Sequence, residues 1–514
     1  MGQKVERARM LVQEFLERSA ARLPQKVALI CDGQRLTYHQ VNCMANRLAH
    51  TLVEKGVLRG DRVVLYLNNT VELVVGIFAV LKAGGVFVVV NPTTKKDKLV
   101  YILNNAGAAG LISSDLPAAP LAEIAAKAPG LRIVIEVSRE KKDAHFLTYE
   151  SIQSSTLEGN LPKKNIDLDL ACLIYTSGST GDPKGVMSDH SNVDFATGSI
   201  ITYLENREDD IVIDLLPLSF DYGLYQLLMV FKFGGTLVLE KGFAFPAAVL
   251  KKMQEEKVTG FPGVPTIFAV LNRMDLSSYD LSRLRYLSNT AAALPVSHII
   301  QIQEKFPWAK LFSMYGLTET KRTLYLPPDQ LETRPGSVGI AIPGTEVWLE
   351  DEDGRRLSPG ETGELVVRGR HVMRGYWNEP EMTARRYRPG PIPGERLCYT
   401  NDLFRTDEDG YFYFVSRKDD IIKSRGEKVS PVEVERSLYA IPGVLEAAVI
   451  GIPDPVLGQS IKAFIVTDRL DLTRNEVLAH CKSQLDDFMV PQVIEFVPEL
   501  PKTSSGKIKK TDLQ

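Results

Sequence analysis

The sequence has 514 residues, more than one compact core usually holds, so we expect at least two domains. Apolar residues make up 44% and charged residues 24%, which is the balance of an ordinary globular protein. A formal net charge of −3 argues against a strongly basic surface, and we expect no nucleic-acid partner.

The cysteines and the most apolar segments indicate a cytoplasmic protein. The cysteines are odd in number and have no metal-ligand spacing, which is typical of free thiols in a reducing compartment: Cys31, Cys43, Cys172, Cys398 and Cys481. The charged N-terminal segment lacks the apolar centre of a signal peptide. The most apolar stretch, 73–90, is interrupted by Lys82 and by Gly84 and Gly85. It predicts a helix followed by a buried strand, and we expect no transmembrane segment.

The first part of the chain alternates short apolar runs with helical patterns. Runs 62–67 and 86–90 predict strands, and the segment between them predicts a helix that ends at a glycine. The same pattern returns as a strand at 211–217, a helix at 222–235 and a strand at 236–240. Such near-continuous apolar strands joined by helices predict an α/β fold whose sheets are covered on both faces.

The later chain has a different character. Turn-forming pairs become frequent after about residue 320, and strands such as 363–369 alternate in polarity, which predicts an antiparallel β-subdomain at about 321–415. A charged segment, 416–420, then precedes a unit with the pattern of a small α+β domain. We therefore predict an N-terminal core at 1–418 and a C-terminal domain at 419–514.

A glycine-rich loop follows an apolar strand at 171–186. Its glycines allow the backbone to approach an anion, and Ser and Thr hydroxyls and Lys184 add donors and charge. The loop residues that we predict to bind the phosphates of ATP are Thr176, Ser177, Gly178, Ser179, Thr180, Gly181 and Lys184. Because Asp182 follows the last glycine, the loop is not a Walker P-loop. The alternative is an ordinary surface loop.

The segment YTSGSTGDPKGV (175–186) resembles the phosphate-loop signature of the adenylate-forming superfamily. That family includes acyl-CoA synthetases, adenylation domains of nonribosomal peptide synthetases and firefly luciferase. The resemblance covers essentially the whole chain, because further motifs follow in the family's order. It implies a large core with a rotating C-terminal lid domain, and an enzyme that joins a carboxylic acid to AMP and then transfers the acyl group to a thiol.

A second motif, YGLTE (315–319), predicts a magnesium site. A carboxylate beside a polyphosphate needs a cation between them, and Mg²⁺ prefers oxygen ligands, so Glu319 suits that ion. The resemblance implies that Glu319 is the metal ligand, that Thr318 contacts phosphate, and that Tyr315 and Gly316 belong to the nucleotide site. An exposed turn is the alternative interpretation.

Two other segments resemble nucleotide-binding elements of the family. The small residues after the strand 283–288 leave a flat slot, so Ala291 and Ala292 are predicted to contact adenine; a helix start is the alternative. Asp402 is predicted to accept hydrogen bonds from both ribose hydroxyls. Asn401 replaces the family's usual glycine before it, and asparagine tolerates a left-handed backbone better than most residues.

The resemblance extends to the predicted hinge and to the end of the chain. Arg417 is expected to contact ribose or phosphate, Asp419 to be the hinge, and Gly426 to lie on the loop that guides the thiol. In the segment PKTSSGKI (501–508), Lys507 matches the family's catalytic lysine. A lysine on a short loop can neutralise the attacking carboxylate and the α-phosphate together. Exposed charged segments are the alternative interpretation at both places.

The identity of the acid depends on the segment LPLSFDYG (216–223). Phe220 and Asp221 resemble the element of amino-acid adenylation domains in which the aspartate pairs with the substrate's α-amino group, and Val264 is assigned to the same acid pocket. On this interpretation the acid is an amino or imino acid, for example proline, loaded onto a phosphopantetheinyl carrier protein. The alternative is that Asp221 caps a helix starting at Tyr222. The acid is then a fatty or aryl acid loaded onto coenzyme A.

The same motifs are compatible with two other functions, and one further segment resembles a catalytic motif. A nucleotide-binding scaffold without catalysis is possible, but the presence of Lys507 and Glu319 argues against it. A luciferase-like oxidase is also conceivable on this scaffold. The segment from His190 to Asp194 imitates an acyltransferase motif, but it lacks a second histidine and a following glycine. We interpret it as the start of a helix.

Overall fold

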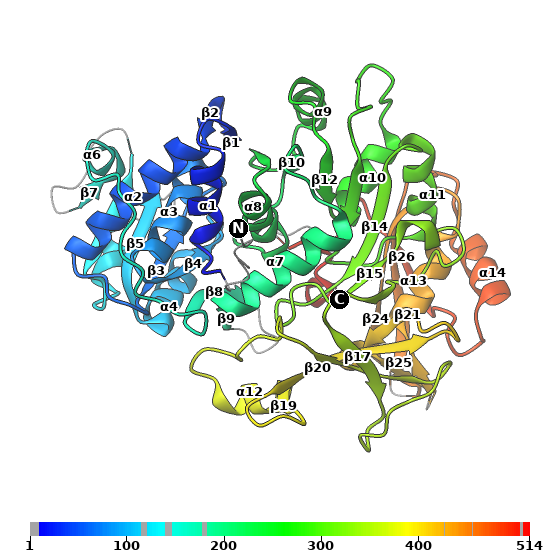
Figure 1. Cartoon of the computed structure of the whole chain (residues 1–514). Helices are drawn as coiled ribbons and strands as arrows, with labels where there is room; N and C mark the ends of the chain where they lie inside the picture. Colours follow the sequence, from blue (N-terminus) through cyan, green and yellow to red (C-terminus); the bar gives the residue numbers. More distant parts are fainter. Residues whose placement is uncertain are drawn as a thin grey trace, which may run out of the picture.

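The structure is a computed structural model that describes residues 10–114, 121–138, 146–176, 182–425, 427–454, 456–503 and 507–513. Two large sheets with their helices form the N-terminal part, and two smaller sheets follow (Figure 1). The mixed α/β architecture with a large N-terminal and a small C-terminal domain confirms the predicted fold class. No described helix combines the length and the hydropathy needed to cross a membrane.

The first large sheet has seven strands in the order β7-β6-β5-β3-β4-β8-β9. The strands are β3 (Arg62–Tyr66), β4 (Val86–Val90), β5 (Ala108–Ser114), β6 (Ile133–Val137), β7 (Leu147–Thr148), β8 (Leu170–Thr176) and β9 (Lys184–Asp189). The associated helices are α2 (Tyr38–Glu54), α3 (Val71–Lys82), α4 (Lys96–Ala106), α5 (Leu121–Ala126) and α6 (Tyr149–Gln153). All neighbouring strands are parallel except the hairpin of β8 and β9.

The second large sheet has nine strands in the order β16-β15-β14-β13-β12-β10-β11-β1-β2. The strands are β1 (Val27–Cys31), β2 (Gln34–Thr37), β10 (Ile211–Asp214), β11 (Thr236–Leu239), β12 (Gly260–Gly263), β13 (Tyr286–Asn289), β14 (Lys310–Tyr315), β15 (Leu324–Leu326) and β16 (Ile340–Ala341). The associated helices are α1 (Glu14–Arg22), α7 (His190–Leu204), α8 (Asp221–Phe233), α9 (Pro246–Glu255), α10 (Pro265–Arg273), α11 (Val296–Lys305) and the 3-10 helix η1 (Pro328–Gln330).

The smaller sheets come later in the chain. One is antiparallel and consists of β17 (Glu346–Glu350), β18 (Thr362–Arg368), β19 (Tyr387–Pro389), β20 (Arg396–Thr406) and β21 (Phe412–Arg417), with helix α12 (Pro380–Arg386). The other consists of β22 (Ile422–Ser424), β23 (Glu427–Val429), β24 (Val444–Asp454), β25 (Gly458–Thr467) and β26 (Val493–Phe496), with α13 (Pro431–Tyr439), α14 (Arg474–Gln484), η2 (Lys418–Asp420) and η3 (Lys510–Asp512). The domain boundary at 418/419 and the start of the β-subdomain near 321 remain predictions, since β15 and β16 pair within the nine-stranded sheet.

Strand β4 shows why its sequence lacks polar alternation. Phe87 and Val89 pack into the large core between the two main sheets, whereas Val86, Val88 and Val90 pack under α4 and α5 on the opposite face. Both faces of the strand are therefore buried, and every position must be apolar. The 73–90 stretch is indeed a helix followed by a buried strand, as predicted.

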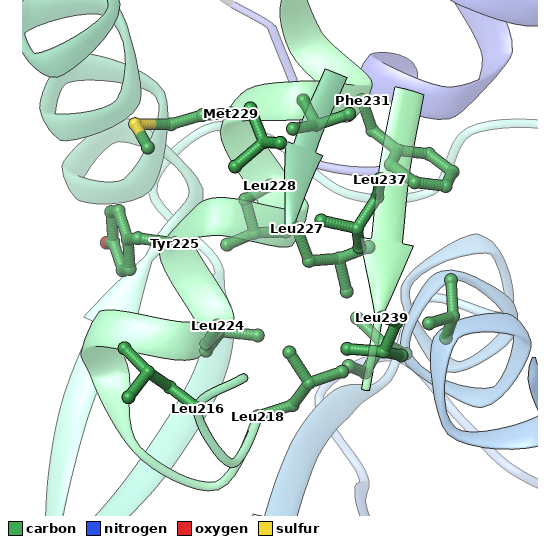
Figure 2. Close-up of a cluster of buried hydrophobic side chains, with 14 of the residues drawn as sticks. Leu216, Leu218, Leu224, Tyr225, Leu227, Leu228, Met229, Phe231, Leu237 and Leu239 are labelled. Atoms are coloured by element: carbon green, nitrogen blue, oxygen red, sulfur yellow. The ribbon is translucent and has the colours of Figure 1, made fainter. Parts of the chain in front are cut away.

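Helix α8 lies in the centre of the large core and leads into the candidate site. Figure 2 shows its side chains Leu224, Leu227 and Phe231 among leucines of β11 and of the segment that precedes the helix. All positions from 221 to 231 are buried, and Gly234 ends the helix with φ +87°. Because both ends of α8 are fixed by packing, the side chains in its first turn have defined positions.

The loop from β14 to β15 folds back tightly on itself. The Thr323 amide donates to the Tyr315 carbonyl at 2.9 Å, and the Thr320 and Thr323 hydroxyls are 2.7 Å apart. A Cβ atom added at Gly316 would lie 1.8 Å from the carbonyl oxygen of Lys321. Only glycine therefore permits this turn, which carries the candidate residues Thr318 and Glu319.

We predict that Gly316→Ala lowers the melting temperature, because the clash with backbone must be relieved by moving the loop at a cost of about 1–3 kcal/mol. The measurement is thermal unfolding, with Gly336→Ala as the control, since no atom lies within 4 Å of a Cβ added there. Equal melting temperatures for the two variants would contradict the interpretation.

Candidate active site

The glycine-rich loop joins the two strands of an antiparallel hairpin. Thr176 at the end of β8 pairs in register with Lys184 at the start of β9. The predicted phosphate-binding residues between them, Ser177, Gly178, Ser179, Thr180 and Gly181, lie outside the described residues, as does Gly426 in the predicted thiol loop. The roles of all these residues remain predictions.

Lys507 reaches from the C-terminal domain to the start of helix α8 in the core. Its Nζ atom lies 5.4 Å from the centre of the Phe220 ring. The base of its loop is held by two contacts: the Lys507 amide donates to the Thr503 hydroxyl at 3.1 Å, and Lys502 forms an ion pair with Glu446 at 2.6 Å. The two domains therefore meet at this lysine.

The surroundings of Lys507 are rich in predicted site residues. Burial lowers the pKa of Lys507, while the carboxylates of Asp221, Asp402 and Glu319 raise it and Arg417 lowers it further. These four groups come from α8, β20, the β14–β15 loop and β21, which are far apart in the sequence. The fold thus brings the predicted lysine, the predicted metal ligand and the predicted ribose ligand to one place.

Glu319 is held by residues that sequence reasoning missed. The Tyr376 hydroxyl donates to Glu319 Oε1 at 2.6 Å, and the Met373 amide donates to the Glu319 carbonyl at 3.0 Å. Burial alone would lower the pKa of Arg386, but Glu319 and other nearby acidic groups raise it above its usual value. No motif marked Tyr376, which lies in a turn-rich segment, or Arg386, which ends the short helix α12.

The site fits a magnesium ion that is bound mainly by a substrate. Within the described ranges, no three His, Cys, Asp or Glu side chains gather closely enough to hold a metal ion. Glu319 Oε2 accepts no hydrogen bond from any described residue, so one carboxylate oxygen is available. A single carboxylate together with phosphate oxygens is the usual coordination of Mg²⁺ in nucleotide sites.

Asp402 lies in a buried, well-connected position. The Tyr315 hydroxyl donates to its Oδ2 atom at 2.6 Å, and Arg417 Nε is 3.5 Å from Oδ1. Burial raises the pKa of Asp402, and Arg417 and Tyr315 oppose that shift. The preceding Asn401 has φ +58°, the left-handed conformation for which asparagine is suited.

The predicted hinge has a hydrogen-bond network that the sequence did not indicate. Asn401 Nδ2 donates to Asp419 Oδ2 at 2.7 Å, and the Asn401 amide donates to Glu364 Oε1 at 2.7 Å. Lys418 Nζ lies 2.6 Å from the other Glu364 oxygen. The residue that replaces the family's usual glycine therefore connects β18, β20 and the predicted hinge.

The predicted adenine loop is irregular, so the alternative of a helix start at this position is wrong. Ala291 has φ +80°, and Asn289 Nδ2 donates to the Ala292 carbonyl at 3.1 Å. The next helix, α11, begins only at Val296. Val264, assigned to the acid pocket, is 3% exposed and immediately precedes α10. The substrate contacts of these residues remain predictions.

Asp221 has a partner in the protein itself. Helix α8 begins at Asp221 with Phe220 at the N-cap, and no side chain caps it, so the interpretation of Asp221 as a cap before Tyr222 is wrong. Instead, Arg322 Nη1 lies 3.6 Å from Asp221 Oδ2. The guanidinium of Arg322 also lies over the Tyr222 ring, 4.4 Å from its centre. Sequence reasoning missed Arg322, although a basic pair directly after Thr320 was a possible signal.

The acyltransferase-like segment starts a helix, as predicted. Helix α7 begins at His190, and Asp189 caps it with a reciprocal bond to Asn192. His190 Nδ1 accepts from the Val12 amide at 3.0 Å, and burial lowers the pKa of His190 to about 4. Asp194 pairs with Lys232 at 2.8 Å. The side chains of His190 and Asp194 therefore stabilise the fold around helix α7.

Comparisons with known proteins identify the same family across both parts of the chain. The profile of the AMP-binding enzyme family matches residues 16–377, and that of the AMP-binding enzyme C-terminal domain matches residues 433–507. A long-chain-fatty-acid–CoA ligase of Bacillus subtilis is 34% identical, over 98% of this chain and 94% of its own length. Gramicidin S synthase 2 of Brevibacillus brevis is 30% identical over 98% of this chain, which spans only 11% of that protein.

The solved structures agree with the sequence relatives. The crystal structure of the anthranilate CoA ligase AuaEII in complex with anthranoyl-AMP superimposes with a TM-score of 0.89 at 29% identity. The match covers 98% of this chain and 96% of that one. The family profiles, these relatives and the solved structures lead to one conclusion: the chain belongs to the AMP-binding enzyme family and is an ATP-dependent, adenylate-forming ligase.

Proposed function

We propose that this protein is an AMP-forming ligase that activates a carboxylic acid lacking a free amino group and transfers it to the thiol of coenzyme A. The observation that carries the choice of acid is the ion pair of Asp221 with Arg322 at 3.6 Å. A buried carboxylate needs a counter-charge, and this one has it within the protein. Asp221 therefore does not need an ammonium group of the substrate as its counter-charge.

The first half-reaction forms a mixed anhydride. A carboxylate oxygen attacks the α-phosphorus of ATP, the bond to the bridging oxygen breaks, and pyrophosphate leaves. Lys507 lies over the ring of Phe220, which we assign to the acid pocket, and we assign to it the neutralisation of the carboxylate and the α-phosphate. Asp402 and Arg417 are assigned to the ribose and phosphate, and Glu319 with Thr318 to the phosphates. Mg²⁺, which Glu319 would hold, supplies charge neutralisation for the pyrophosphate.

The second half-reaction forms the thioester. The thiol sulfur attacks the acyl carbonyl, AMP leaves, and the thiol proton passes to solvent or to the departing phosphate. We assign Asp419 as the hinge about which the C-terminal domain rotates between the two steps, and Gly426 to the thiol path. One cleft can then serve both reactions, because rotation exchanges Lys507 for another surface of the same domain.

A second candidate is the loading of an amino or imino acid, such as proline, onto a carrier protein. It is favoured by the length of the Asp221–Arg322 contact, which at 3.6 Å is beyond hydrogen-bond distance. The carboxylate of Asp221 therefore keeps acceptor capacity that an ammonium group could use.

We predict that Lys507→Ala lowers the rate of adenylate formation by about 10²–10³-fold, the usual loss for one electrostatic stabiliser. Thioester formation from a supplied acyl-adenylate should be unaffected. Single-turnover assays of the two steps make this measurement. Lys509→Ala is the control, because Lys509 is exposed on the same loop and pairs with Asp512. An equal loss in both steps would refute the assigned role.

We further predict that Asp221→Asn lowers the melting temperature, because Arg322 loses its anion. Pyrophosphate exchange should then fall to a similar extent for amino, aryl and fatty acids. Asp194→Asn serves as the control, since it breaks an ion pair with Lys232 on the core helices. A loss confined to amino acids, in a variant that remains folded, would instead establish the carrier-protein alternative.

A further inference from the structure

Two basic side chains are buried against helix α8, whose first residue, Asp221, we assign to the acid pocket. Lys321 and Arg322 follow directly after the loop that carries Glu319, and they are 0% and 2% exposed. Lys321 has φ +58°, a left-handed conformation that non-glycine residues adopt at a cost of about 1–2 kcal/mol. A buried pair of cations in a strained turn is an expensive arrangement, and it requires compensation by anions.

Arg322 is compensated within the protein. Its guanidinium lies between the Asp221 carboxylate, 3.6 Å away, and the face of the Tyr222 ring, 4.4 Å from the centre. The Tyr222 hydroxyl in turn bonds to the Ser288 carbonyl at 2.7 Å, which keeps the ring in place. Asp221 therefore supplies one negative charge for Arg322.

Lys321 has no such compensation among the residues that the structure describes. Its Nζ atom has no hydrogen-bond partner and forms no ion pair within 4.0 Å. The Nζ atom lies over the Tyr225 ring, 5.5 Å from its centre. Burial lowers the pKa of Lys321, and Cys172, Asp221 and Glu319 oppose that shift. The amine is therefore buried with its donors unused by any described residue.

The two basic side chains therefore differ in their partners. Arg322 pairs with Asp221, whereas Lys321 has no ion pair or hydrogen bond among the described residues. Glu319 is not its partner: its Oε1 atom accepts from the Tyr376 hydroxyl, and its Oε2 atom is the oxygen that we assign to Mg²⁺. Lys321 thus has donors for an anion, and on the proposed function the acid substrate is an anion that binds beside Asp221.

The anion that we assign to Lys321 is not the reacting carboxylate of the substrate. Lys507 marks the reacting end, because it lies over Phe220 at the N-cap of α8. Lys321 lies over Tyr225, five residues further along the helix, which is about 7 Å along the axis. Figure 2 shows Tyr225 on the side of α8 opposite Leu237 and Leu239, so the ring faces away from the leucine core. The two lysines therefore lie at different positions along α8.

We propose that Lys321, supported by Arg322, binds a second carboxylate of the substrate, so that the preferred acid is a short dicarboxylic acid of which only one carboxylate is adenylated. This inference rests on the proposed ligase function and specifies its substrate class. Lys321 is a specificity residue: it binds the group that does not react. The alternative is that Lys321 is purely structural, with the Tyr225 ring as its sole compensation.

The test is ATP–pyrophosphate exchange with matched pairs of acids: butanoate with succinate, hexanoate with adipate, and benzoate with terephthalate. The wild-type protein should show a kcat/KM that is about 10–100-fold higher for the dicarboxylic member of the best pair, the effect of one charged hydrogen bond. In Lys321→Met this ratio should fall close to one. Lys232→Met is the control, because it removes another largely buried lysine that lies over the Phe15 ring and pairs with Asp194.

Binding gives a second readout. Succinate or adipate with ATP should raise the melting temperature of the wild type and of Lys232→Met, and should leave that of Lys321→Met unchanged. Wild-type preference for the monocarboxylic acids overturns the inference, as does a ratio that Lys321→Met leaves intact. If no acid of any class supports exchange, the ligase function itself fails, which is a distinguishable result. If Lys321→Met does not fold, the wild-type ratios of kcat/KM between dicarboxylic and monocarboxylic acids decide whether the inference holds.

Discussion

The concentration of basic side chains around the start of helix α8 and the β14–β15 loop is the constraint on which the rest of this structure depends. Each of five basic side chains interacts with one or more of the carboxylates Asp221, Asp402 and Glu319; the five are Lys507, Arg417, Arg386, Lys321 and Arg322. Like charges in a region of low dielectric repel strongly, so such a cluster requires either internal anions or a highly charged ligand. ATP is such a ligand, and in the proposed function it binds at the cations around Lys507. Lys321 is assigned to the acid substrate.

Helix α8 gives this cleft its geometry. Its side chains from Asp221 to Phe231 are buried, and its start presents Phe220 to Lys507 and Asp221 to Arg322. One rigid element therefore positions the residues that we assign to the acid. Tight packing allows this precision, because a helix fixed on all sides cannot shift to accommodate misplaced ligands.

The position of the C-terminal domain depends on a few polar contacts. Asn401 and Glu364 hold the predicted hinge segment through Asp419 and Lys418. In the small domain, Ser430 donates to the Val415 carbonyl at 2.7 Å, which links α13 to β21. These contacts are partly exposed and replaceable by water, so each is worth little. Weak contacts of this kind suit the rotation between two half-reactions that we propose for this domain.

The sequence by itself determined the α/β class and the order of the principal strands and helices, because both-face burial forces continuous apolar runs such as 86–90. It also indicated the family, since its motifs are local and occur in a fixed order. Only the tertiary structure decided what surrounds each motif. The contacting partners are far apart in the sequence. Tyr376 is 57 residues from Glu319, Glu364 is 54 residues from Lys418 at the predicted hinge, and Arg322 is about 100 residues from Asp221. Such partners have no local signature, because a counter-charge acts through space and not along the chain.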